Sequence, residues 1–192
     1  QMVLQNPYGS FNPHFTIGAA LSRAVRMFRA DAPVDPADLL ARVRLPATYA
    51  DASPDQLSGG ELQRAAIAQA LAAGPDLIIC DEATSALDVS VQAVVIELLR
   101  TLSEEEGVAL LIISHDLGVV GSLSEETHVL EDGRIVEHAK TADLLRAPRS
   151  DLARRLIAAR PDLVDTAEMP ADHTADAADH LQKEADHDPI HS

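Results

Sequence analysis

The chain has 192 residues, of which 46% are hydrophobic, so it is long enough to bury one ordinary core. Its formal net charge of −16 at pH 7 excludes a surface built for nucleic-acid phosphates, which needs clustered basic side chains. A single cysteine, Cys80, excludes an internal disulfide and indicates a reducing compartment.

The first part of the chain is expected to form one strand and two helices. Met2-Val3-Leu4 is typical of a strand, and the Pro, Gly and Asn cluster at 6–10 predicts a loop. Thr16 precedes apolar residues at positions 17, 21, 25 and 28, which have helical spacing. Asp35-Pro36 opens a second short helix that extends through Val43.

A helix is predicted over residues 58–73, ended by Gly74-Pro75. Ser58 and Glu61 fit the S-x-x-E capping box, and capping alone is one interpretation of this segment. Gly59 and Gly60 support a second interpretation. They remove side chains where backbone N–H groups and a positive helix end point outward, so that an anionic phosphate can approach.

Two short apolar runs, 77–80 and 108–113, are predicted to be parallel strands covered on both faces, with an amphipathic helix over 90–106 between them. Residues 129–136 predict a hairpin around the turn at 131–134, followed by helices near 141–147 and 150–159. The apolar runs are far shorter than the roughly 18 to 20 residues that span a bilayer.

The last 32 residues, 161–192, hold nine acidic side chains against Lys183, which gives them a net charge of −8. Their composition predicts disorder or a marginal solvated helix. His173, His180, His187 and His191 lie among these acids, and a weak Ni²⁺ or Zn²⁺ site there is a hypothesis that competes with a merely solvated tail.

Polar side chains follow both predicted central strands. Asp81 and Glu82 end the first, and His115 follows the second, so all three are expected at the carboxyl edge of the sheet, where α/β proteins bind ligands. One carboxylate there can hold Mg²⁺ and the other can act as a general base, while an imidazole can hold a terminal phosphate. Asp88 lies in the loop after the acids, as a helix cap or as a bridge to a neighbouring subunit.

Four segments together resemble the ATP-binding subunits of ABC transporters. LSGGELQR is similar to the signature motif, LIICDEATSALD to the Walker B motif and D-loop, and the following SHD to the switch histidine. QMVLQNPYGSFNP resembles the Q-loop. The sequence NPYGSFNP within it, together with TSALDVSVQA, is similar to that of the oligopeptide, dipeptide and nickel importer branch. The segment at 147–152 departs from the HPYT-like sequence of that branch.

The resemblance implies a role for each matching residue. Glu82 would be the catalytic base, Asp81 and Gln5 would serve Mg²⁺, and His115 would contact the γ-phosphate of ATP. The signature residues would close on a nucleotide held by the opposite subunit, and Asp88 would help couple the two sites. The implied signature contacts are Ser58, Gly59, Gly60 and Glu61.

The resemblance also implies a fold and partners. The expected fold is α/β, a P-loop NTPase-like ABC ATPase core with a parallel sheet and flanking helices, plus an α-helical signature subdomain. The domain would span residues 1–160, with the helical subdomain at about 12–75 and the catalytic core at about 76–140. The expected partners are a second ABC subunit, homo- or heterodimeric and head to tail, the transmembrane permease and, indirectly, an extracytoplasmic solute-binding protein. The expected location is the cytoplasmic face of the membrane, and no nucleic acid is implied.

The sequence contains no G-x-x-x-x-G-K-[ST] loop, and its first residue is Gln1. These observations predict a chain that is incomplete at its N-terminus and hydrolyses no ATP by itself, because the main phosphate cradle is missing. The leading hypothesis is an ATP-hydrolysing subunit that drives import of peptides or a related small solute. A non-catalytic remnant that binds a partner and a soluble ABC ATPase outside transport are the alternatives.

Overall fold

The computed structural model describes residues 1–159. The predictions of a disordered acidic tail and of a metal site among its histidines concern residues 161–192 and therefore lie outside the described residues.

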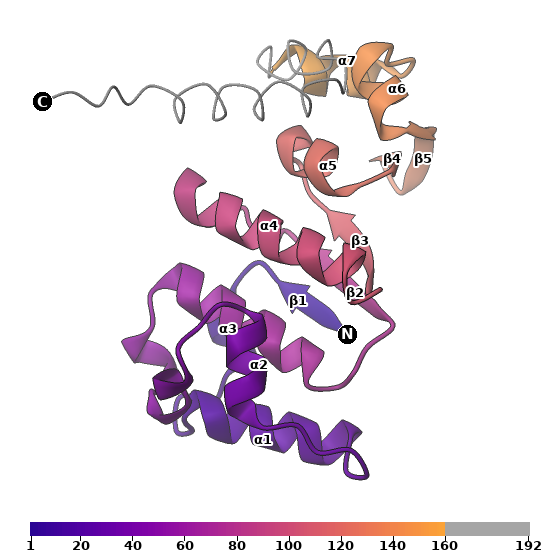
Figure 1. Cartoon of the computed structure of the whole chain (residues 1–192). Helices are drawn as coiled ribbons and strands as arrows, with labels where there is room; N and C mark the ends of the chain where they lie inside the picture. The colour runs from indigo at the N-terminus through magenta and orange to yellow at the C-terminus, as the bar shows by residue number, and fades with distance from the viewer. Residues whose placement is uncertain (160–192) are drawn as a thin grey trace, which may run out of the picture.

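The described chain alternates helices and strands in the order expected of an α/β protein (Figure 1). Three short 3-10 helices, η1–η3, accompany them. The elements are β1 (Met2–Leu4), η1 (Pro7–Ser10), α1 (Ile17–Phe28), α2 (Pro36–Arg42), η2 (Ala47–Asp51), η3 (Pro54–Gln56), α3 (Gly59–Leu71), β2 (Leu77–Asp81), α4 (Val89–Glu104), β3 (Ala109–Ile113), α5 (Leu117–Leu123), β4 (Glu126–Glu131), β5 (Arg134–Lys140), α6 (Thr141–Arg146) and α7 (Asp151–Ala158).

The predicted strands pair in parallel, in the order β1-β2-β3. The opening strand is confirmed, and so are the two central strands with a helix, α4, between them. The loop predicted at 6–10 is instead a 3-10 turn, because the Asn6 side chain accepts a hydrogen bond from the backbone N–H of Tyr8 and Pro7 occupies the first turn.

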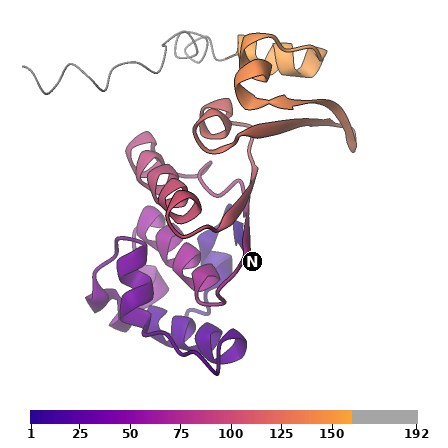
Figure 2. The same cartoon turned by 45° about the vertical axis from the view of Figure 1, so that its right-hand side comes forward.

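The helices cover one face of this sheet (Figure 2), and the prediction that both faces are covered is wrong for the described residues. Val3, Ile78 and Cys80 point into the core and are at most 2% exposed. The opposite face carries side chains that are 42–50% exposed, and no described element packs over them; they are Met2, Leu4, Leu77, Leu111 and Ile113. Apolar runs alone could not reveal this difference, because both faces of β2 are equally hydrophobic.

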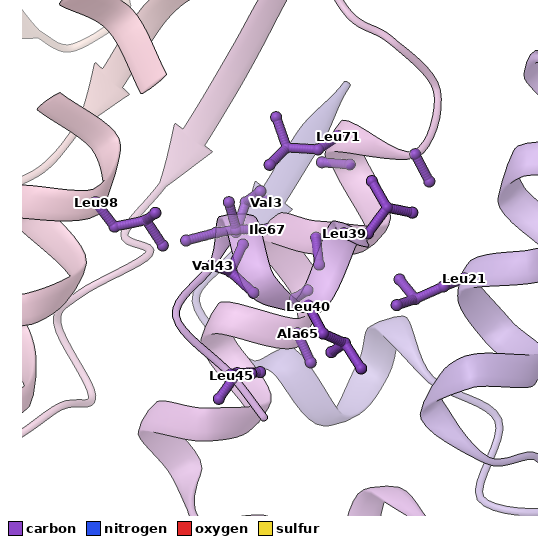
Figure 3. Packing of buried hydrophobic residues seen from close by; sticks show 14 of the residues in the cluster. Val3, Leu21, Leu39, Leu40, Val43, Leu45, Ala65, Ile67, Leu71 and Leu98 are labelled. Atoms are coloured by element: carbon purple, nitrogen blue, oxygen red, sulfur yellow. The ribbon is translucent and has the colours of Figure 1, made fainter. Parts of the chain in front are cut away.

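The main core lies between the sheet and helices α1–α4, where Leu and Ile side chains from separate helices meet (Figure 3). Thr16 caps α1 as predicted, because its hydroxyl accepts from the N–H of Ala19 at 3.2 Å. Ile17, Leu21 and Val25 of the predicted apolar stripe are buried. The fourth member, Phe28, is 55% exposed because α1 ends there, beyond the helices that cover its other residues.

A smaller second cluster lies behind the predicted hairpin, which is formed by β4 and β5. Asp132 and Gly133 both have positive φ, 47° and 75°, and this left-handed pair closes the two-residue turn. The buried Glu137 carboxylate accepts from the N–H groups of Arg149 and Ser150 and thereby orients the start of α7. The two predicted C-terminal helices are therefore confirmed as α6 and α7.

Within residues 1–159, no helix combines the length and the apolar character that crossing a membrane requires.

The two faces of β2 predict unequal losses of stability when a side chain is shortened to alanine. Ile78→Ala should lower the free energy of unfolding by about 2–5 kcal/mol, because Ile78 is fully buried, whereas Leu77→Ala, on the open face and 42% exposed, should cost much less. Urea unfolding of both variants measures the difference. Equal losses would contradict the assignment of the buried face.

Candidate functional site

The ends of the three parallel strands lie at one level. Leu4 pairs with Asp81, and Asp81 pairs with Ile113, so each strand ends at the same edge of the sheet. The next residues along the chain are Gln5, Glu82 and the pair Ser114-His115. Strand register therefore brings three distant segments of sequence to one edge. The pattern of apolar runs predicted this for the segments of Glu82 and His115, but not for that of Gln5.

Glu82 and His115 touch at this edge. The Nδ1 atom of His115 lies 2.8 Å from Oε1 of Glu82, and the side chains are 74% and 24% exposed respectively. The hydrogen bond that His115 donates to Glu82 raises the pKa of His115, and the carboxylate charges of Glu82 and Asp116 act in the same direction, whereas burial lowers it. The pair can therefore share or pass a proton at the sheet edge.

The backbone of Glu82 adopts an unusual conformation that aims this side chain. Its φ of 51° lies in the left-handed region, which a non-glycine residue occupies at a cost. The N–H of Glu82 donates to the carbonyl of Ile113 at 2.9 Å, and its own carbonyl accepts from the N–H and the hydroxyl of Ser85. These bonds hold the chain in the conformation that turns Glu82 toward His115.

The second oxygen of Glu82 has no protein partner. Oε2 is buried and accepts no hydrogen bond from the described residues. A buried carboxylate oxygen without a donor is costly, so this atom is suited to accept a proton or a hydrogen bond from a ligand such as water. The chemistry of a general base fits this position better than that of a structural cap.

The neighbouring residues fit a magnesium ion. Asp81 lies on the same face of β2 as Leu77 and Ile79, so its half-buried side chain is on the open face, next to the strand that leads into Gln5. Residues 1–159 contain no group of three or more His, Cys, Asp or Glu side chains placed to hold a metal. One carboxylate and one amide oxygen are what Mg²⁺ commonly takes from a protein, with water and phosphate as its other ligands.

The start of α3 is built by the predicted capping box. The Glu61 carboxylate accepts from the N–H of Ser58 at 2.8 Å and from its hydroxyl at 2.7 Å, and Ser58 caps the N–H of Glu61 in return. Glu61 is thereby held with a pKa below its ordinary value, first because of the bond from the Ser58 hydroxyl.

The two signature glycines differ in their surroundings. A Cβ added to Gly59 would meet nothing within 4 Å, so this residue is open to a ligand as predicted. Gly60 is buried, and a Cβ there would lie 2.1 Å from Cγ1 of Val91. The expectation that both glycines face outward is therefore wrong for Gly60, whose missing side chain lets α3 approach α4.

Asp88 caps the helix that Gly60 touches. Its carboxylate accepts from the hydroxyl of Ser90 at 2.6 Å and from the N–H of Val91 at 3.0 Å, and these bonds lower its pKa, the Ser90 bond most. The exposed Asp88 is thus a helix cap in this chain, and the start of α4 lies against the start of α3.

Three contacts at the site were not foreseen from the sequence. The buried Gln63 donates to the carbonyl of Leu4 at 3.3 Å and ties α3 to β1, and Gln92 donates to Asp116, the residue after His115, at 3.3 Å. The Tyr49 hydroxyl donates to Glu61 at 2.7 Å. No spacing rule marks such side chains, because their partners are distant in sequence.

Comparisons with known proteins show what this chain is similar to. A family profile described as "ABC transporter" matches residues 1–85. A probable peptide ABC transporter ATP-binding protein of Sinorhizobium fredii is 44% identical over 165 residues, which are 84% of this chain and 47% of that protein. A putative peptide import ATP-binding protein of Brucella melitensis is 39% identical over 174 residues, 88% of this chain and 52% of the relative. A glutathione import ATP-binding protein of Pectobacterium atrosepticum is 40% identical over 84% of this chain and 26% of its own length.

Solved structures match as well, and they confirm the predicted ABC ATPase fold class. The ATP-binding cassette MJ0796, a dimer bound to ADP and phosphate in a post-hydrolysis state, has a TM-score of 0.61 at 28% identity, over 73% of this chain and 63% of that one. The cbiO1 protein from Clostridium perfringens has a TM-score of 0.67 over 88% of this chain and 66% of its own; at 23% identity it supports the fold alone. The chain spans about half the length of the first two peptide-transport relatives. It carries an ABC transporter ATP-binding domain.

Proposed function

We propose that this chain serves in an ATP-hydrolysing subunit of an ABC importer and provides the catalytic carboxylate, the switch histidine and the signature segment. The observation that carries the proposal is the 2.8 Å contact between His115 and Glu82 at the carboxyl end of a parallel sheet, beside Asp81. A base, a phosphate-facing imidazole and a candidate cation ligand at one edge are the parts that phosphoryl transfer to water needs.

Each of these side chains has a role in the proposed mechanism. Glu82 orients a water molecule and takes its proton as the water oxygen attacks the terminal phosphorus and the bond from that phosphorus to the leaving ADP breaks. The unpartnered Oε2 is the atom suited to that proton. His115, whose Nδ1 contacts Oε1 of Glu82, presents its other ring nitrogen to the γ-phosphate. Asp81 and Gln5 would hold Mg²⁺, which supplies positive charge against the phosphate oxygens.

The signature segment is proposed to act on a nucleotide held by a second ABC subunit, arranged head to tail. The open Gly59, the capped Ser58 and the positive end of the 13-residue α3 suit a phosphate that arrives from outside the monomer. Gly60 and Glu61 would shape this end, and Asp88 would couple it to the partner through α4. The dimeric state of the related MJ0796 cassette supports this arrangement.

The proposed cargo is a small peptide or a related solute. This proposal is supported by the relatives, which are named as peptide ABC transporter, peptide import and glutathione import ATP-binding proteins. The proposed partners are membrane permease subunits and, indirectly, a solute-binding protein. The proposed location is the cytoplasmic face of the membrane. We also propose the domain division expected from the sequence, with a helical signature subdomain at about 12–75 and a catalytic core at about 76–140.

The Glu82–His115 contact predicts a titration. In metal-free buffer the pKa of His115 should lie above the ordinary value of about 6.5, and Glu82→Gln should lower it, because the charged partner is lost. A raised pKa in the folded state means that the contact stabilises the fold fully below about pH 6.5 and that this contribution is lost as the pH rises through the raised value. NMR of the imidazole signals measures both, and an unchanged pKa in Glu82→Gln would contradict the contact.

The catalytic assignment predicts a loss of turnover in a chimera. The 192-residue chain alone should hydrolyse no measurable ATP. A chimera in which residues 1–159 replace the aligned segment of the Sinorhizobium fredii relative should hydrolyse ATP. Glu82→Gln should then lower kcat by at least about 100-fold, as expected on removal of a general base.

Glu97→Gln, which removes a surface ion pair with Arg100, is the matched control and should leave the chimera active. Full activity of the Glu82→Gln chimera would refute the assignment. Mg²⁺-dependent turnover by the 192-residue chain alone, lost in Glu82→Gln, would refute the expectation for the separate chain.

A further inference from the structure

A tyrosine from a distant turn completes the hydrogen bonds of Glu61. The capping box occupies only one oxygen of this carboxylate, because both bonds from Ser58 end on Oε2. The other oxygen, Oε1, accepts the hydroxyl of Tyr49 at 2.7 Å. The carboxylate is therefore held from two sides, by the residue it caps and by a side chain twelve positions upstream.

The turn that carries Tyr49 is fixed against α1. It lies in η2, and the N–H of Ile17 donates to the carbonyl of Ala52, directly after η2, at 2.9 Å. Gly18 faces Ala50 so closely that a Cβ would lie 2.8 Å from its carbonyl oxygen. Because this contact leaves no room for a side chain, the position of α1 determines where η2 and the Tyr49 hydroxyl lie.

The other charged group near Glu61 does not replace this bond. Arg64, one turn further along α3, donates through Nη1 to the backbone carbonyls of Arg44 and Val43 at 2.7 and 3.5 Å. Its charge contributes least to the lowered pKa of Glu61, after the bonds from Ser58 and Tyr49. Conversely, the bond to Glu61 is the main cause of the raised pKa of Tyr49. The two side chains act as one hydrogen-bonded unit.

We infer that Tyr49 is a positioning residue for the signature segment, because its hydroxyl fixes the Glu61 carboxylate that in turn fixes Ser58. This inference rests on the proposed function, in which the Ser58-Gly59 end of α3 meets a nucleotide phosphate. The bonds from Tyr49 and Ser58 together hold this carboxylate in one position, so the capping contact that shapes the Ser58-Gly59 end is kept. In this way the position of α1 affects the phosphate-facing end of α3 through η2, Tyr49 and Glu61.

Tyr49→Phe removes only the hydroxyl and tests this chain of contacts. In the 192-residue protein, carbon-13 NMR should show the pKa of Glu61 rising toward its ordinary value, since one of its stabilising bonds is gone, while thermal unfolding stays cooperative. Exchange of the Ser58 amide, which donates to the same carboxylate, should accelerate at least about twofold. Tyr8→Phe, which alters the one other tyrosine, is the matched control and should change neither signal.

The catalytic consequence is measured in the chimera described above, where Tyr49→Phe should lower kcat/KM about three- to tenfold, the scale of one typical intramolecular hydrogen bond. An unchanged Glu61 pKa in Tyr49→Phe would overturn the inference, and so would an active chimera whose kcat/KM does not respond to the change. An inactive parent chimera would count against the proposed function instead, and the NMR result would still decide the role of Tyr49.

Discussion

The parallel pairing of three short strands is the constraint on which the site depends. Leu4, Asp81 and Ile113 share one level of the ladder, so the residues that follow them leave the sheet together. A slip of one residue in β2 would turn Ile78 to the open face and Asp81 to the buried face, and it would move Glu82 out of reach of His115. The hydrophobic burial of Ile78 and Cys80 against α3 and α4 therefore also sets the geometry of the Glu82–His115 pair.

The signature helix joins this edge through contacts of a different kind. Its start is determined locally by the capping box, whereas its place relative to the sheet depends on tertiary packing. Gln63 ties α3 to the end of β1, and Gly60 admits Val91 so that α3 and α4 begin side by side. The two glycines thus have different roles: Gly59 leaves the helix end open, and Gly60 permits close packing of α3 on α4.

Much of this arrangement could be predicted from the sequence, because its causes are local or periodic. The caps at Thr16, Ser58 and Asp88 and the apolar runs of β2 and β3 carry their own signals. The open face of the sheet could not be predicted, since exposure depends on which elements pack there. The φ of Glu82 and the bond from Tyr49 to Glu61 were equally hidden, because both follow from contacts between segments far apart in sequence.

The central claim is that Gln5, Glu82 and His115 surround one cation and phosphate site at the edge of the sheet. Mn²⁺, which can replace Mg²⁺ at oxygen ligands, offers the most direct test through its broadening of nearby NMR signals. In the chimera described above, Mn²⁺ with ATP should broaden the signals of these three residues and spare the hairpin turn at Gly133, and Asp81→Asn should abolish the effect. Sharp signals from all three residues, with broadening elsewhere in the chain, would contradict the account.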